Sequence, residues 1–133
     1  MSRERIDREL ARLLCGGQRA EIVANGRIFV VYRDVRTGGD GLQLPTMTDV
    51  IVPVPDGYPA SMIDLAGLPL GSPFLQRVKG GQNNQGLVLV DQRQWQLASY
   101  HPHNGGGGPP WNQQRHGFDT YLDHLLTWLD RLT

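Results

Sequence analysis

The chain has 133 residues, enough to bury one hydrophobic core without support from a metal or a disulfide. Its 13 basic and 13 acidic residues balance, so we expect neither nucleic acid nor a membrane surface as a partner. The lone cysteine, Cys15, excludes an intramolecular disulfide and a four-cysteine zinc site. The first residues lack the apolar core of a signal peptide, and no segment approaches the ~20 apolar residues of a membrane span. We therefore expect a cytoplasmic protein.

The N-terminal region predicts an amphipathic helix. Its apolar residues at helical spacing are Ile6, Leu10, Leu13 and Leu14. The pair Gly16 and Gly17 predicts where the helix stops.

Strands are predicted next. Residues 20–35 read as AEIVA and RIFVVYRDV, with Asn25-Gly26 as the hairpin turn between them. Glycines make residues 37–45 a loop. The run DVIVPVP at 49–55 alternates valines on one face, and its prolines favour an edge or a strand end.

The second half of the chain begins with an irregular, proline-rich region. A short strand is expected near residues 62–65, and a second hairpin pairs residues 86–91 with 94–100 across Gln92-Arg93. A final helix starts with Asp119 as its N-cap. Its predicted buried stripe is Leu122, Leu125, Leu126, Leu129 and Leu132. The pattern predicts one α+β domain over residues 1–133, with helices segregated from an antiparallel meander sheet.

Ser99, His101 and His103 occupy alternate positions after the last predicted strand. If that strand continues through Pro102, the three side chains share one face. A serine beside an imidazole is the minimal pair of nucleophile and base, because a hydroxyl needs a group that takes its proton. The spacing is equally consistent with a strand end whose polar residues face water.

The histidines alone do not predict a metal site. His101, His103, His116 and His124 supply several imidazoles, but no cysteine or carboxylate stands at a recognisable ligand spacing. We expect no metal and no cofactor. For Cys15 we expect a structural role, because the end of a helix disfavours a thiolate.

Several motifs, in their order along the chain, resemble the ubiquitin-conjugating-enzyme (UBC) fold, in its divergent bacterial branch. They are VIVPVPDGYP at 50–59, YHP at 100–102, Trp111, and GFDTYLDHLL at 117–126. Taken alone, the turn around Tyr58 is a structural feature. The resemblance implies a UBC-like fold, a ubiquitin-like modifier as one partner and an activating-enzyme-like protein as another.

The chain departs from that family at the active-site loop. HNGGGGPPW at 103–111 contains no cysteine, and His103 stands where the family has the asparagine that follows His-Pro. One interpretation is a modifier carried as an oxyester on Ser99, with His101 as base. His103 or Asn104 would then support the oxyanion.

In the same interpretation, the residues that contact the incoming C-terminal tail are Tyr58, Gly105, Gly106 and Trp111. Two other interpretations stay open. The domain is a catalytically inactive variant that binds a modifier or an activating enzyme, or it is a general peptide-binding adaptor.

Overall fold

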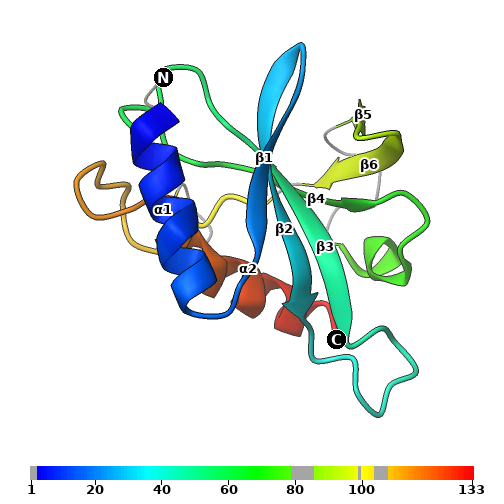
Figure 1. Ribbon diagram of the computed structural model, residues 1–133. Coiled ribbons are helices and arrows are strands. Elements are labelled where there is room, and N and C mark those ends of the chain that lie inside the picture. Colours follow the sequence, from blue (N-terminus) through cyan, green and yellow to red (C-terminus); the bar gives the residue numbers. More distant parts are fainter. Residues whose placement is uncertain (1–2, 79–85, 99, 104–107) are drawn as a thin grey trace.

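The computed structural model describes residues 3–78, 86–98, 100–103 and 108–133. Helix α1 (Arg3–Cys15) precedes a curled antiparallel sheet, and helix α2 (Phe118–Arg131) follows it (Figure 1). The strands are β1 (Ala20–Asn25), β2 (Arg27–Arg36), β3 (Met47–Pro53), β4 (Ala66–Pro69), β5 (Leu87–Val90) and β6 (Arg93–Ala98). A 3-10 helix, η1 (Pro73–Arg77), follows β4. The α+β prediction is confirmed.

The sheet is not a simple meander. Its strand order is β1-β2-β3-β4-β6-β5, so β6 lies inside the sheet and β5 at its edge. The pairing of β4 with β6 sets Ala66 opposite Ala98. This antiparallel register brings the residues just before β4 next to those just after β6, although they lie more than 30 positions apart in sequence.

Helix α1 buries a narrower face than the leucine pattern predicts. Ile6, Glu9 and Leu13 are buried, whereas Leu14 is 62% exposed. Since successive residues turn by ~100° around a helix, Leu14 points away from the stripe that Ile6 and Leu13 define. Cys15 is exposed at the end of the helix, so its side chain does not contribute to the buried core.

The first hairpin is confirmed, with Asn25 opposite Arg27 and Gly26 at a φ of 73°. The second hairpin turns one residue earlier than predicted, at Asp91 and Gln92, which have φ values of 57° and 61°. Two positive φ values in a two-residue loop match the twist of the flanking strands. Neither residue is glycine, which is why the turn was hard to place from sequence.

The remaining boundaries shift by a few residues. Strand β3 is an inner strand, and Pro53 ends it. The short strand expected near 62–65 begins instead at Ala66. Helix α2 begins at Phe118 after Gly117 as N-cap, so Asp119 lies in its first turn.

One face of the sheet packs against both helices to form the main core. Side chains that alternate along the central strands point into it, among them Val30 and Tyr32 of β2 and Val50 and Val52 of β3. Helix α2 contributes Phe118, Tyr121, Leu125, Trp128, Leu129 and, just past its end, Leu132. This core supports the segment that joins β6 to α2.

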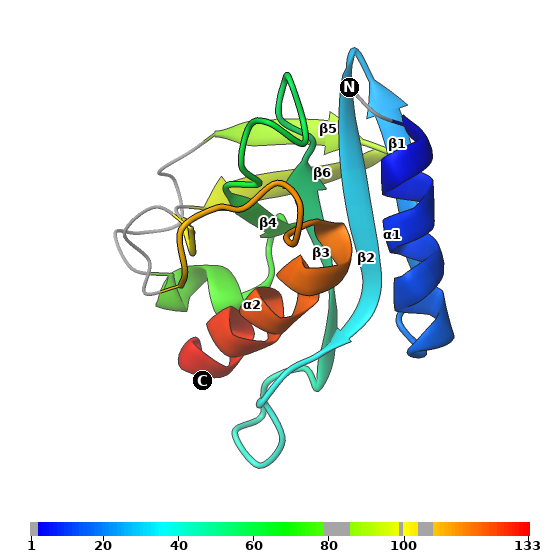
Figure 2. The same ribbon diagram turned by 90° about the vertical axis from the view of Figure 1, so that its left-hand side faces the viewer.

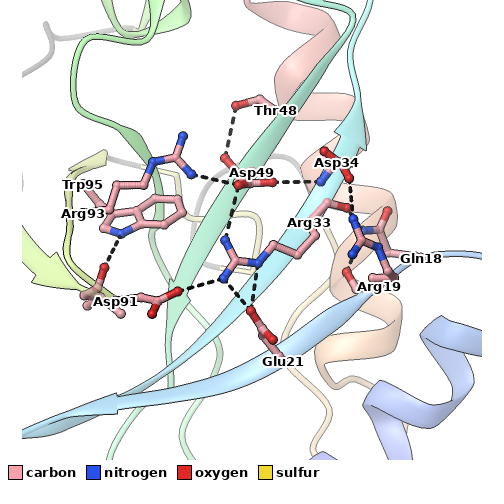
Figure 3. A network of polar contacts seen from close by, with 11 residues as sticks. Gln18, Arg19, Glu21, Arg33, Asp34, Thr48, Asp49, Asp91, Arg93 and Trp95 are labelled. Carbon is pink, nitrogen blue, oxygen red and sulfur yellow. Dashed lines mark hydrogen bonds and ion pairs between the residues drawn. The ribbon is translucent and has the colours of Figure 1, made fainter.

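The opposite face carries a second, smaller core because the sheet curls. It consists of Phe29, Val31, Ile51, Val90, Trp95 and Leu97. Charged residues cover it: Arg33 pairs with Glu21, Asp49 and Asp91, and Arg93 also pairs with Asp49 (Figure 3). The network thus joins β1, β2 and β3 to the hairpin formed by β5 and β6.

Neither α1 nor α2, the α-helices of the part that the structure describes, has the length and apolar character needed to cross a membrane.

Candidate functional site

The segment after β6 crosses to the start of α2, drawn yellow to orange in Figure 2. Tyr100 anchors its beginning: the ring is buried and stacks on Trp128 at 5.2 Å between centroids. Its hydroxyl donates to the carbonyl of His124 at 2.5 Å, and burial raises the pKa of Tyr100 to about 12. The backbone that leads into His101 is therefore held in place by Tyr100.

His101 pairs with a carboxylate that the sequence did not suggest. Its Nδ1 lies 2.6 Å from Oδ1 of Asp64, in the segment before β4. The pairing of β4 with β6 sets Ala66 opposite Ala98, and beyond it the Leu65 N–H donates to the Tyr100 carbonyl at 2.9 Å, so the chain on either side of Asp64 and His101 is held together. Both side chains are about one-third exposed, at 33% and 34%, so the pair lies at the protein surface.

This pair has a defined chemical capacity. A carboxylate that accepts a hydrogen bond from Nδ1–H fixes the ring orientation and leaves Nε2 as the basic nitrogen. It also stabilises the imidazolium that forms when Nε2 takes a proton. An imidazole held in this way has the chemical capacity of a general base.

Sequence reasoning missed Asp64 because the pair spans 37 positions. No local spacing signals it.

His103 does not share a face with His101, which corrects the prediction from alternate spacing. Strand β6 ends at Ala98, and Pro102 and His103 form a turn that the Gly108 N–H closes by donating to the Pro102 carbonyl at 2.9 Å. Without an extended backbone the two-residue period no longer applies. His103 is 8% exposed, and its Nδ1 donates to the Pro109 carbonyl at 2.8 Å.

His103 is the centre of a ring cluster, which we call the imidazole cluster. Its ring lies 4.6 Å from His116, 4.9 Å from His124 and 5.0 Å from Trp111. Burial, and then the neighbouring His103, lowers the pKa of both His116 and His124. Among the described residues, His103 Nε2 is a buried nitrogen without a hydrogen-bond partner.

Within the described ranges, no group of three or more His, Cys, Asp or Glu residues has a geometry that could hold a metal ion. The rings of the imidazole cluster pack against one another. At centroid distances of 4.6–5.0 Å these rings are in ordinary aromatic contact.

Tyr58 and Trp111 lie beside one another, with their ring centroids 6.2 Å apart. Tyr58 is 1% exposed and donates its hydroxyl to Glu9 at 2.6 Å. Burial, and then Glu9, raises the pKa of Tyr58 well above its usual value. Trp111 donates its indole N–H to the Pro59 carbonyl at 2.9 Å. Tyr58 thus supports Trp111, while its own ring offers almost no surface to a ligand.

Trp111 is only partly buried. It borders an open hollow of about 470 Å³ whose other lining residues are Ala60, Pro110, Asn112, Gln113 and Gln114. Of the predicted contact residues within the described ranges, Trp111 is the better placed to touch a partner.

Glu9 is a second residue that sequence reasoning missed. It is 2% exposed, yet it accepts hydrogen bonds from Arg5 at 2.7 Å, from Tyr58 and from the Phe118 N–H at 3.0 Å. It thereby connects α1, the turn at Tyr58 and the first turn of α2. A signal was present: Glu9 stands three residues after Ile6, on the apolar face of α1.

The remaining predicted site residues, Ser99, Asn104, Gly105 and Gly106, lie outside the residues that the structure describes. Their roles stay predictions.

Comparisons with known proteins found no match. No family model matches the chain, and neither does any curated protein or solved structure.

Proposed function

We propose that the protein is a ubiquitin-conjugating-enzyme-like carrier that holds a ubiquitin-like modifier as an oxyester on Ser99. The observation that carries the proposal is the contact between His101 and Asp64, 2.6 Å between Nδ1 and Oδ1. A hydroxyl nucleophile requires an oriented imidazole within hydrogen-bond reach, and Ser99 stands two residues before His101 in the sequence.

The proposed step is an acyl transfer. The donor is an activating-enzyme-like protein that carries the modifier as a thioester. The Ser99 oxygen attacks the carbonyl carbon of that thioester while His101 Nε2 takes the hydroxyl proton. A C–O bond forms, the C–S bond breaks, and the proton passes from His101 to the departing thiolate. Asp64 stabilises the imidazolium between these two events.

The imidazole cluster has a supporting part in this proposal. Because His103 is buried, we assign it to holding the segment around His101 rather than to the oxyanion. Support of the oxyanion stays assigned to Asn104, by prediction alone. The hollow beside Trp111 is the surface we assign to the modifier tail.

The test combines the protein with its activating enzyme, its modifier and ATP, and follows the adduct by gel electrophoresis. An oxyester survives reductant and breaks in mild base. We expect Ser99→Ala to abolish the adduct, and Ser61→Ala, a change at an exposed serine in the turn after Tyr58, to leave it intact. Ser99→Cys should convert it to an adduct that reductant cleaves.

Two outcomes would contradict the proposal. An adduct lost in Cys15→Ala would show that the thiol of Cys15 is the acceptor. Stable binding of the modifier without any adduct, in all of these variants, would identify a binding module instead.

A further inference from the structure

Leu65, which follows Asp64, has an unusual backbone conformation. Its φ is 66°, in the left-handed region where a Cβ crowds the following carbonyl oxygen. Asn and Asp tolerate this region because their short polar side chains bond to the local backbone, and leucine has no such group. The surrounding structure must therefore hold Leu65 in place.

Two hydrogen bonds hold it, one on each side. The Leu65 N–H donates to the carbonyl of Tyr100 at 2.9 Å, and the Leu65 carbonyl accepts the hydroxyl of Tyr121 at 3.0 Å. Tyr121 is fully buried in α2, and burial raises its pKa well above the usual value. Its hydroxyl consequently stays protonated and remains a donor.

The two anchored residues are the chain neighbours of the pair at the candidate site. Leu65 follows Asp64, Tyr100 precedes His101, and the Leu65–Tyr100 bond joins them. A different φ at Leu65 would rotate the peptide that carries Asp64 and turn its carboxylate from His101.

We propose that Tyr121 and Leu65 are positioning residues: the Tyr121 hydroxyl holds Leu65 left-handed, and this conformation aims Asp64 at His101. The positioning itself is a property of the fold. It rests on the proposed function only in giving the Asp64–His101 pair a catalytic use.

The chain offers a matched control. Tyr32 is another buried tyrosine, and its hydroxyl donates to the Phe118 carbonyl at 2.6 Å. Tyr32→Phe and Tyr121→Phe remove the same group from the same kind of bond. Of these two bonds, the one made by Tyr121 reaches Leu65, the residue next to Asp64.

The experiment records the imidazole ¹⁵N chemical shifts of His101, which report its tautomer and the hydrogen bond at Nδ1. In the unchanged protein we expect Nδ1 and Nε2 to be well separated, as in a fixed Nδ1–H tautomer. Tyr121→Phe should bring the two values together, whereas Tyr32→Phe should leave them unchanged. In the adduct assay, Tyr121→Phe should slow transfer at least 10-fold without weakening modifier binding.

A second pair of variants tests the backbone itself and does not depend on the folding of Tyr121→Phe. Leu65→Val keeps an apolar side chain but makes a positive φ still less favourable, so it should disturb the His101 signals. Leu65→Asn tolerates a positive φ, so it should preserve them and partly restore them when combined with Tyr121→Phe.

The proposal is overturned if Tyr121→Phe and Leu65→Val both leave the His101 signals unchanged, or if Tyr32→Phe shifts them equally. It can fail separately from the proposed function. If Tyr121→Phe shifts the His101 signals but the unchanged protein forms no adduct, the positioning role of Tyr121 and Leu65 is supported. The same result contradicts the proposal that Ser99 carries an oxyester.

Discussion

Two histidines, His101 and His103, stand two residues apart on one segment and have opposite surroundings. His101 is one-third exposed and faces a carboxylate, whereas His103 is buried and faces a carbonyl and other imidazoles. The carboxylate of Asp64 fixes the orientation of the His101 ring, whereas the His103 ring is held by its contacts with other rings. The contrast teaches that the partner of a histidine decides its chemistry, and that spacing along the chain does not.

The strongest test of this contrast removes the carboxylate. We expect Asp64→Asn to lower the rate of adduct formation about 100-fold or more, because the amide no longer stabilises an imidazolium. The free energy of unfolding should change by less than about 1 kcal/mol, since the pair is partly exposed. Single-turnover gels and chemical denaturation measure the two quantities. Asp56→Asn, at an exposed position in the turn before Tyr58, should change neither.

The next test removes the ring of His103 and measures stability rather than adduct formation. Deleting this buried ring in His103→Ala should lower the free energy of unfolding by about 2–4 kcal/mol, as for other buried rings. The same truncation at His101 should lower it by less than about 1 kcal/mol. Urea denaturation decides between these values.

The comparison is sharpened by His103→Phe. This change keeps a planar aromatic ring, though a larger one, and removes both the unpartnered nitrogen and the bond to Pro109, so its effect on stability should be smaller than that of His103→Ala. A large loss in His103→Phe would show that the bond to Pro109 matters more than the packing.

A smaller effect is expected where the backbone closes over the imidazole cluster. A Cβ at Gly108 would lie 2.5 Å from the Pro102 carbonyl oxygen and 3.2 Å from His124. We expect Gly108→Ala to lower the free energy of unfolding by about 1–3 kcal/mol. At Gly16 a Cβ meets only ordinary contacts, at 3.5 Å and beyond, so thermal denaturation of Gly16→Ala should show no comparable loss.

The smallest effect is that of pH on stability. The pKa values of His116 and His124 are lowered from 6.5 in the folded protein, so the unfolded chain binds their protons more readily. The free energy of unfolding should thus hold steady above about pH 6.5 and decrease as the pH falls below it. Urea titrations between pH 7.5 and 5 (about two units around the unfolded value) measure this slope. The double variant His116→Gln, His124→Gln should flatten it, and an equal slope in that variant would assign the effect to other groups.

Local patterns in the sequence predict most of the fold. The first helix, the Asn25-Gly26 hairpin and the last helix all follow from periodicity and turn chemistry, which depend on neighbours in the chain. The buried stripe of α2 is only partly as predicted, because Leu125, Leu129 and Leu132 are buried whereas Leu122 and Leu126 are only partly buried. The second hairpin turns at Asp91 and Gln92, one residue before the predicted position. In the first helix, Leu14 is exposed although the apolar pattern includes it.

The candidate site was less predictable because its contacts are long-range. Sequence spacing drew attention to His101, but Asp64 reaches it through the β4–β6 register and the φ of Leu65. His103 lies in a turn where the Gly108 N–H donates to the Pro102 carbonyl. Neither the register nor that turn can be inferred from the residues on either side of a histidine.

The curl of the sheet also affects how copies of the protein meet one another. An edge strand with unpaired backbone groups is a template on which a second molecule can add a strand. Here the side-chain amide of Asn25, in edge strand β1, donates to the carbonyl of Leu89 in edge strand β5. The charged Arg33 and Asp91 pair nearby. The two borders of the sheet thus lie close together, and part of each edge faces the other rather than a second molecule.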